Sequence, residues 1–207
     1  MIFILPNGSV YDIIITIFLK GMIVLLRRSF STYTIKDMPI RIAGIVRESI
    51  VDGPDLRFVV FTQGCPHKCE GCHNPETHDF SGGFATTTSK IWAEIEKNPM
   101  IKGVTFSGGE PFCQAEALAE LGRAAKENGL HVMTYSGFTF DALLKKAEED
   151  RGVRELLTVT NYLVDGPFVL SQRDISLKYR GSRNQRLLDI TCYPNSTDVQ
   201  DLYKVTD

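Results

Sequence analysis

The sequence lacks several features that would assign it to a common protein class. It has 23 Lys and Arg residues against 25 Asp and Glu residues, so its net charge of -2 provides no overall basic field for nucleic acid. Its five cysteines are an odd number, which suits a disulfide framework poorly and fits a reducing compartment, expected to be the cytoplasm. No internal repeat or low-complexity linker divides the 207 residues, which indicates one domain.

The N-terminal region has no clear membrane or export signal. Residues 13–26 are largely apolar, but Lys20 leaves an uninterrupted run shorter than the about 20 residues of a membrane span. Two arginines follow this stretch, whereas a signal peptide has its positive charges before it. A membrane anchor is the less favoured alternative. We expect residues 1–37 to be an extension outside the working fold and Met38 to be the true start, because patterned sequence follows it at once.

Beyond Met38, short apolar runs alternate with amphipathic segments. The expected strands cover residues 40–46, 56–61, 104–106, 130–135, 161–164 and 187–191. The expected helices cover residues 86–98, 114–128 and 140–149. This alternation predicts an α/β fold with a parallel sheet and flanking helices. Because there are too few units for a closed eight-stranded barrel, we expect an open partial (βα) barrel over residues 38–207.

Four loops that follow expected strands contain residues suited to chemistry. They are the cysteine loop at 65–72, the loop at 107–111, Ser136-Gly137 and Asp165-Gly166-Pro167. In an open parallel sheet, functional loops gather at the carboxyl ends of the strands. We therefore expect these loops to share one edge of the sheet and to form one site.

The cysteine loop is the most specific of these features. Cys65, Cys69 and Cys72 have the spacing C-x3-C-x2-C. Three such thiolates can bind three irons of a four-iron cluster and leave the fourth iron open to a substrate or cofactor. The alternative is a zinc site, since thiolates suit both metals. Its fourth ligand would be one of three nearby histidines, His67, His73 or His78. No second C-x2-C arm is present, which favours the cluster but leaves zinc open.

A second motif, Gly108-Gly109-Glu110-Pro111, follows the strand expected at 104–106. Two glycines let the backbone approach a ligand closely, and Glu110 can accept a hydrogen bond from a cationic amino group. Taken alone, the motif fits a tight turn before a helix equally well. Its place on the same expected edge as the cysteines favours a cofactor site.

The C-x3-C-x2-C loop followed by the Gly-Gly-Glu-Pro loop resembles the radical S-adenosylmethionine superfamily. The resemblance implies an open partial barrel of the radical SAM type that holds one [4Fe-4S] cluster and S-adenosyl-L-methionine. In that superfamily the reduced cluster donates one electron, the sulfonium C–S bond breaks and a 5′-deoxyadenosyl radical forms. The resemblance also implies a one-electron donor such as flavodoxin or ferredoxin.

Three further segments, 72–77, 163–168 and 180–186, resemble the activating proteins of anaerobic ribonucleoside-triphosphate reductases. This closer resemblance covers residues 40–191. It implies an oxidoreductase whose substrate is another protein: a hydrogen atom is taken from a glycine of the partner reductase, which leaves a glycyl radical there. An activase for another glycyl-radical enzyme, such as a formate-lyase type, is the nearest alternative. A zinc-binding interaction module that does no chemistry is the alternative outside enzymes.

The resemblance also implies roles for individual residues. The expected cluster ligands are Cys65, Cys69 and Cys72. The expected cofactor contacts are Gly108, Gly109 and Glu110 at the methionine end, Thr134, Tyr135 and Ser136 near the ribose, and Gly71 and His73 near the adenine. Many superfamily members have an aromatic residue where this chain has Gly71, so the adenine must stack elsewhere, for example on His73 or Tyr135.

The mouth of the site is expected to face the partner reductase. The candidates for this role are Asp165, Arg180, Arg183 and Arg186. For Asp165 the alternative is a plain turn with the following Gly-Pro. For the arginines it is a solvated face, which is the usual meaning of a charge run. A contact to the carboxylate of the cofactor is a further alternative.

Overall fold

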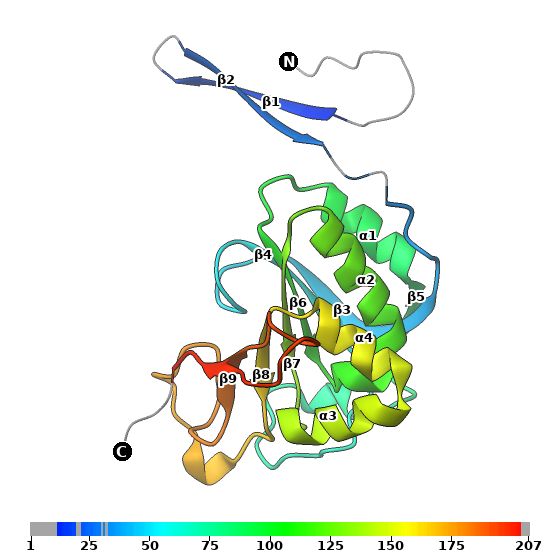
Figure 1. Cartoon of the computed structure of the whole chain (residues 1–207), viewed down its shortest axis with the longest axis vertical. Coiled ribbons are helices and arrows are strands. Elements are labelled where there is room, and N and C mark those ends of the chain that lie inside the picture. The colour runs from blue at the N-terminus through cyan, green and yellow to red at the C-terminus, as the bar shows by residue number, and fades with distance from the viewer. Residues whose placement is uncertain (1–11, 20–21, 30, 32, 204–207) are drawn as a thin grey trace.

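The centre of the structure is an eight-stranded sheet (Figure 1). The structure is a computed structural model and describes residues 12–19, 22–29, 31 and 33–203. The strands lie in the order β10-β9-β8-β7-β6-β4-β3-β5. Their bounds are β3 Pro39–Ser49, β4 Arg57–Thr62, β5 Phe84–Thr87, β6 Gly103–Gly108, β7 His131–Tyr135, β8 Tyr162–Asp165, β9 Arg186–Asp189 and β10 Gln200–Asp201.

The four middle strands, β8, β7, β6 and β4, are parallel, and the strands beyond them on either side pair antiparallel. The helices are grouped on one side of the sheet (Figure 1). They are α1 Thr88–Glu96, α2 Ala115–Glu127, α3 Phe140–Glu149 and α4 Arg151–Val159. Three short 3-10 helices lie in loops, at Pro75–Thr77, Pro111–Gln114 and Leu170–Gln172. The predicted α/β class with a largely parallel central sheet is confirmed.

Each predicted strand and helix corresponds to an observed element, but within residues 38–203 one α-helix and two strands have no counterpart in the sequence prediction. These are α4 and the short strands β5 and β10. Asp150 ends α3, and its carboxylate accepts a hydrogen bond from Val153 N at 3.1 Å to start α4. Gly152, in the first turn of α4, weakens the helical signal. The strands β5 and β10 have four and two residues, too few for a period to be recognised.

The main core lies between the helices and the sheet. Alternate strand residues face it, as Phe58 and Val60 of β4 do, and Leu118 and Leu121 of α2 meet them from the helix layer. All four are almost completely buried. Because the helices cover one face of the sheet, the loops at the strand ends and on the other face are left to form a site.

The N-terminal region forms a separate two-stranded antiparallel sheet, β1 Asp12–Leu19 with β2 Met22–Ser29 (Figure 1). The apolar residues expected at 13–26 therefore lie largely in strands, and residues 20 and 21 are outside the described part. None of the described helices has the length and apolar character that a membrane crossing requires.

The last residues before Met38 contact the main body. The Tyr33 hydroxyl donates to Glu120 Oε1 at 2.7 Å, and Lys36 N donates to the same oxygen at 2.8 Å. The Thr88 hydroxyl donates to Lys36 O at 2.6 Å. These contacts come from the segment that the sequence analysis assigns to the extension, and the start at Met38 stays a prediction.

The face of the sheet away from the helices buries a cation, Arg57. Its guanidinium donates to Thr105 Oγ1 at 2.6 Å, to Val104 O at 2.5 Å and to Pro54 O at 3.0 Å, and within the described residues it has no carboxylate partner. Burial lowers the pKa of Arg57 to about 10. Arg57 Nη2 also donates to His131 Nδ1 at 3.3 Å, which requires His131 to be neutral. Burial, and then the charge of Arg57, lower the pKa of His131 from 6.5 to about 4.

We predict that acidification destabilises the fold through His131. Between pH 6.5 and about 4 the unfolded chain binds a proton at His131 that the folded chain excludes, so the free energy of unfolding falls as pH falls through this range. His131→Asn should therefore reduce the pH dependence. Anaerobic urea titrations of both proteins at several pH values give the free energy of unfolding. If this free energy changes equally with pH in the two proteins, the prediction is contradicted.

Candidate functional site

The four predicted loops meet around one cavity at the carboxyl ends of β4, β6, β7 and β8. The cavity has a volume of about 510 Å³. It is lined by the three clustered cysteines, by Gly108 and Gly109, by Ser136 and Gly137, and by Gly166. The predicted gathering of these loops at one edge is therefore observed.

The cysteine loop is fixed by protein contacts at its start. Gly64 N donates to Thr77 O at 2.8 Å, and Cys65 N donates to His78 O at 3.1 Å. Cys65 is buried, while Cys69 and Cys72 are half-buried. Burial raises the pKa of the Cys65 thiol, so a nearby metal cation is what would favour its thiolate.

The donor set fits an iron–sulfur cluster with one open iron. Three thiol groups from one loop line the cavity, and Cys113 and Cys192 do not. Among the residues that the structure describes, no three His, Cys, Asp or Glu side chains are grouped as ligands of a single metal ion. A four-iron cluster does not require such convergence, because each thiolate binds a different iron.

The two glycines of the Gly-Gly-Glu-Pro motif are required by close backbone packing. Gly108 has a φ of +92°, and a Cβ there would lie 2.6 Å from Thr62 N. A Cβ at Gly109 would lie 2.4 Å from Gly64 O, the residue that precedes the first cysteine. Glu110 N donates to that same oxygen at 2.8 Å. The motif therefore abuts the cysteine loop directly.

The Glu110 side chain connects three of the loops. It is fully buried and accepts hydrogen bonds from Phe112 N at 3.0 Å and from Gly137 N at 2.8 Å. The Ser136 hydroxyl also donates to it, at 3.1 Å to the nearer oxygen. His67 of the cysteine loop is 2.9 Å away through Nε2. The Glu110 carboxylate thus connects the loops after β4, β6 and β7 without lining the cavity.

The zinc alternative considers His67 as a metal ligand, but its ring has other partners in the structure. Its ring is bonded to Glu110 and packs edge-on against Phe138, with the ring centroids 4.4 Å apart. A Cβ at Gly137 would lie 2.3 Å from the same ring. His67 therefore positions the cysteine loop, and its location within that loop is the one sequence signal that could have suggested this.

The predicted cofactor contacts are divided between the cavity wall and the interior. Tyr135, Ser136 and His73 line the cavity. Thr134 does not; it is buried, and its hydroxyl is 2.8 Å from that of Thr160. Burial also raises the pKa of Tyr135 above its ordinary range.

Phe168 is a cavity residue that the sequence analysis does not single out. Its ring lies 5.0 Å from that of His73, and both line the cavity. Gly71, with a φ of +69°, does not line it, and a Cβ there would lie 2.8 Å from Leu170 and 3.4 Å from Phe168. An aromatic ring is thus present beside the third cysteine, although it comes from the loop after β8 instead of from position 71.

The four residues expected at the mouth differ in their surroundings. Asp165 is 1 % exposed, accepts from Phe140 N at 2.7 Å and pairs with Arg186, so these two charges are already matched. Arg183 is exposed and pairs with Asp174 at 3.1 Å. Arg180 is 8 % exposed and lines the cavity. Its Nε is buried and has no hydrogen-bond partner among the described residues.

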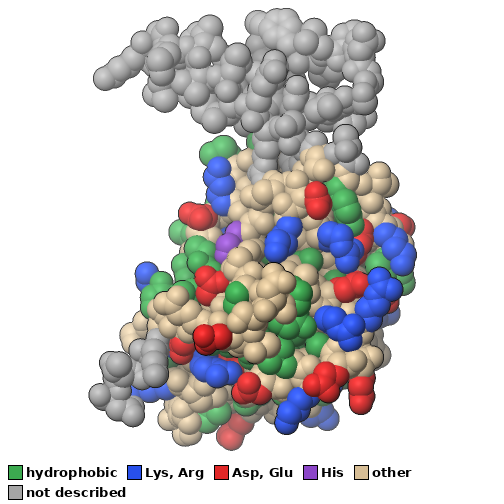
Figure 2. Space-filling view, viewed as in Figure 1, with side chains coloured by type: hydrophobic (Ala, Val, Ile, Leu, Met, Phe, Trp, Pro, Cys, Tyr) green, Lys and Arg blue, Asp and Glu red, His purple; other side chains and the backbone are tan. Residues whose placement is uncertain are grey.

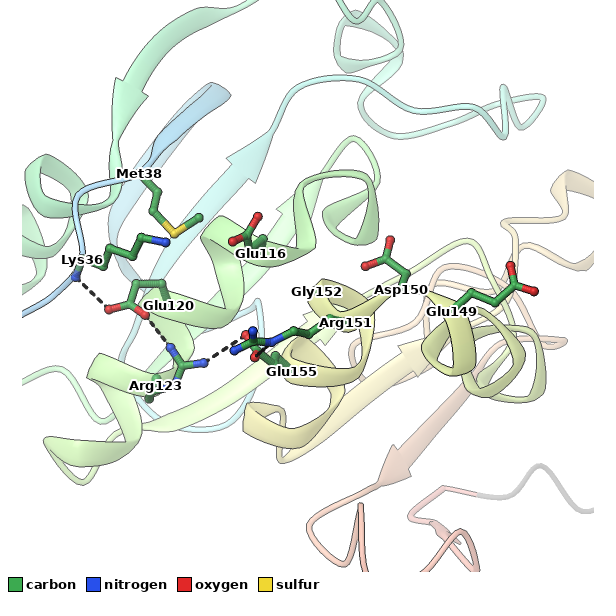
Figure 3. Close-up of a pocket in the computed structure, with 10 residues that line it drawn as sticks. All are labelled: Lys36, Met38, Glu116, Glu120, Arg123, Glu149, Asp150, Arg151, Gly152 and Glu155. Carbon is green, nitrogen blue, oxygen red and sulfur yellow. Dashed lines mark hydrogen bonds and ion pairs between the residues drawn. The ribbon is translucent and has the colours of Figure 1, made fainter.

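A second cavity, of about 820 Å³, lies on the helix side (Figure 3). It is lined by residues 36 and 38, by α2 and by the junction of α3 and α4. Two of its three cations are paired with acids: Arg123 bonds Glu120 and Glu155, and Arg151 bonds Glu155 (Figure 3). It is larger, but it has no cysteine and none of the predicted site residues, so we place the candidate site at the cysteine cavity.

The comparisons with known proteins identify the family. The family described as "4Fe-4S single cluster domain" matches residues 51–188, which include every residue that lines the cysteine cavity. The chain belongs to this family. The zinc alternatives for the cysteine loop are therefore wrong, and the predicted [4Fe-4S] cluster and S-adenosyl-L-methionine are confirmed as the cofactors of this radical S-adenosylmethionine enzyme.

The chain is similar to two kinds of activating protein. The anaerobic ribonucleoside-triphosphate reductase-activating protein of Vibrio cholerae is 35% identical over 145 residues, which cover 66% of this chain and 89% of that protein. Its counterpart from Haemophilus influenzae is 31% identical over 144 residues, again covering 66% and 89%. The pyruvate formate-lyase 1-activating enzyme of Escherichia coli is 34% identical over 156 residues, covering 72% of this chain but 60% of that enzyme.

We predict that Gly109→Ala weakens cofactor binding, because its Cβ would push the loop away from Gly64. The dissociation constant for S-adenosylmethionine should rise at least about tenfold, equivalent to about 1.4 kcal/mol. Gly44→Ala is the control, since nothing lies within 4 Å of a Cβ there. Equilibrium dialysis on anaerobically purified proteins measures the change, and equal affinities in the two variants would contradict it.

Proposed function

We propose that this protein activates anaerobic ribonucleoside-triphosphate reductase by generating a glycyl radical on it. When bound, the [4Fe-4S] cluster and S-adenosylmethionine supply the 5′-deoxyadenosyl radical that abstracts the hydrogen atom. The observation that carries the proposal is that three cysteines and the two glycines of the Gly-Gly-Glu-Pro loop line one cavity. The chain also spans 89% of a reductase-activating relative but 60% of a formate-lyase-activating one, which favours the reductase.

The chain's own residues position the reactants. We propose Cys65, Cys69 and Cys72 as the cluster ligands. The methionine end of the cofactor lies against Gly108 and Gly109. Glu110, which was also expected to contact it, instead binds the cysteine loop and the loop after β7 from the interior. Tyr135 and Ser136 lie near the ribose, supported by the buried Thr134, and His73 lies near the adenine with Gly71 behind it. The ring of Phe168 beside His73 supports this placement of the adenine.

We also propose how the sheet curves, what reduces the cluster and where the protein works. The sheet is proposed to curve as an open partial barrel, which the run of parallel strands and the linear strand order support. A small one-electron donor such as flavodoxin or ferredoxin is proposed to reduce the cluster. The cytoplasm is the proposed location, because five free cysteines suit a reducing compartment. The body from residue 38 onward is the proposed activase domain.

The surface charges fit recognition of a specific partner better than binding to nucleic acid. On the face shown in Figure 2, Lys and Arg side chains are interspersed with Asp and Glu side chains. The cavity mouth is therefore where recognition is proposed to take place. Arg180, which lines the cavity and is 8 % exposed, is the proposed contact there.

The activation assay tests the proposed function directly. Anaerobic protein, dithionite, S-adenosylmethionine and the host reductase should give a glycyl radical in the electron paramagnetic resonance spectrum, and formate lyase should not. Cys69→Ala should abolish the radical because it removes a cluster ligand. Cys192→Ala should retain it, since Cys192 is exposed and does not line the cavity. A radical formed by Cys69→Ala would refute the ligand assignment.

We predict that Arg180→Gln weakens activation by raising the reductase concentration needed for half-maximal radical formation, roughly tenfold or about 1.4 kcal/mol. Cleavage of S-adenosylmethionine without reductase should be little changed. Arg151→Gln, an exposed ion-pair variant on α4, is the control. If the variant instead loses affinity for S-adenosylmethionine, Arg180 faces the cofactor carboxylate and not the reductase.

A further inference from the structure

A short helix after the third cysteine faces the cavity with both of its ends. This 3-10 helix, Pro75–Thr77, has Asn74 before it and His78 after it. Asn74 and His78 line the cysteine cavity, whereas the three helical residues between them do not. The segment 74–78 therefore borders the space beside the thiol groups at two points.

Backbone contacts fix both ends of this segment. Thr77 N donates to Asn74 O at 3.0 Å, and His78 N donates to Pro75 O at 3.2 Å. His78 O in turn accepts a hydrogen bond from Cys65 N at 3.1 Å. The place of His78 relative to the first cysteine is therefore set by hydrogen bonds between protein groups and does not depend on a bound cofactor.

The first end of the segment already donates to a sulfur. Asn74 N donates a hydrogen bond to Cys72 Sγ at 3.4 Å. A donor directed at a thiolate favours its negative charge. In iron–sulfur clusters, hydrogen bonds to the sulfurs are among the factors that set the reduction potential. The segment thus supplies one contact of the kind that tunes a cluster.

The second end has a ring nitrogen that the described residues leave unpaired. The His78 ring is half-buried and lines the cavity, and its Nε2 is shielded from water with no hydrogen-bond partner in the described part of the chain. A buried nitrogen without a partner destabilises a fold, unless a bound group supplies the partner. Thiolates and cluster sulfides are hydrogen-bond acceptors, which matches an imidazole N–H.

We propose that the His78 Nε2–H group donates a hydrogen bond to a sulfur of the [4Fe-4S] cluster and raises the reduction potential of the cluster. Reduction adds one negative charge, and a donor directed at a sulfur stabilises that charge. His78 thereby makes the cluster easier to reduce without being a ligand of iron. This inference rests on the proposed function and its cluster ligands, and it adds a residue that controls the electron-transfer step.

Two substitutions at the same position test this proposal. His78→Phe keeps a planar ring but removes the donor, and at a fixed solution potential its ratio of reduced to oxidised cluster should fall about tenfold, equivalent to a midpoint about 59 mV lower. His78→Gln is the matched control, because its side chain keeps an N–H donor and its midpoint should stay nearer that of the wild type. Anaerobic redox titrations without S-adenosylmethionine, followed by the electron paramagnetic resonance signal of the reduced cluster, measure the midpoints.

The outcomes separate this role from the proposed function. Equal midpoints in the wild type and His78→Phe, at equal iron and sulfide content, overturn the role of His78 and leave the proposed function standing. Equal midpoints in His78→Phe and His78→Gln overturn it too, because the donor then makes no difference. If His78→Phe does not load iron, His78→Met, which also lacks an N–H donor, takes its place with the same expected shift. A wild type that holds no [4Fe-4S] cluster overturns the proposed function and the role of His78 together.

Discussion

The buried carboxylate of Glu110 is the interaction on which the site depends. It receives hydrogen bonds from the loop that follows β6, from the loop that follows β7 and from His67 of the cysteine loop. These bonds add to the backbone contacts of the loops, such as those of Gly64 and Cys65 with residues 77 and 78. A shared acceptor with no exposure to water fixes the three relative to one another before any cofactor binds, which is how a protein preorganises a reaction site.

Much of the fold and the location of the site could be predicted from the sequence because the signals are local. A β-branched run such as 56–61 is recognisable on its own, and Gly129 after an amphipathic segment indicates the end of a helix. The gathering of the four loops then follows from a general property of parallel sheets. The cysteine spacing adds a chemical signal that does not depend on the fold.

The remaining features depend on contacts between distant residues. Nothing in the sequence pairs His67 with Glu110, or brings Phe168 beside His73 across almost one hundred positions. The burial of Asp165 against Arg186 is of the same kind, since both residues resemble surface charges when considered singly. Helix α4 could not be predicted for a local reason: Gly152, a residue of low helix propensity, lies in its first turn.

The contacts that hold the start of the cysteine loop do not use the thiols. The bonds from Gly64 and Cys65 to residues 77 and 78, and the pairing of His67 with Glu110, involve no thiol. Removal of iron would leave them in place. We therefore expect the start of the cysteine loop to keep its conformation when the cluster is lost, so that reloading with iron and sulfide does not require the chain to refold.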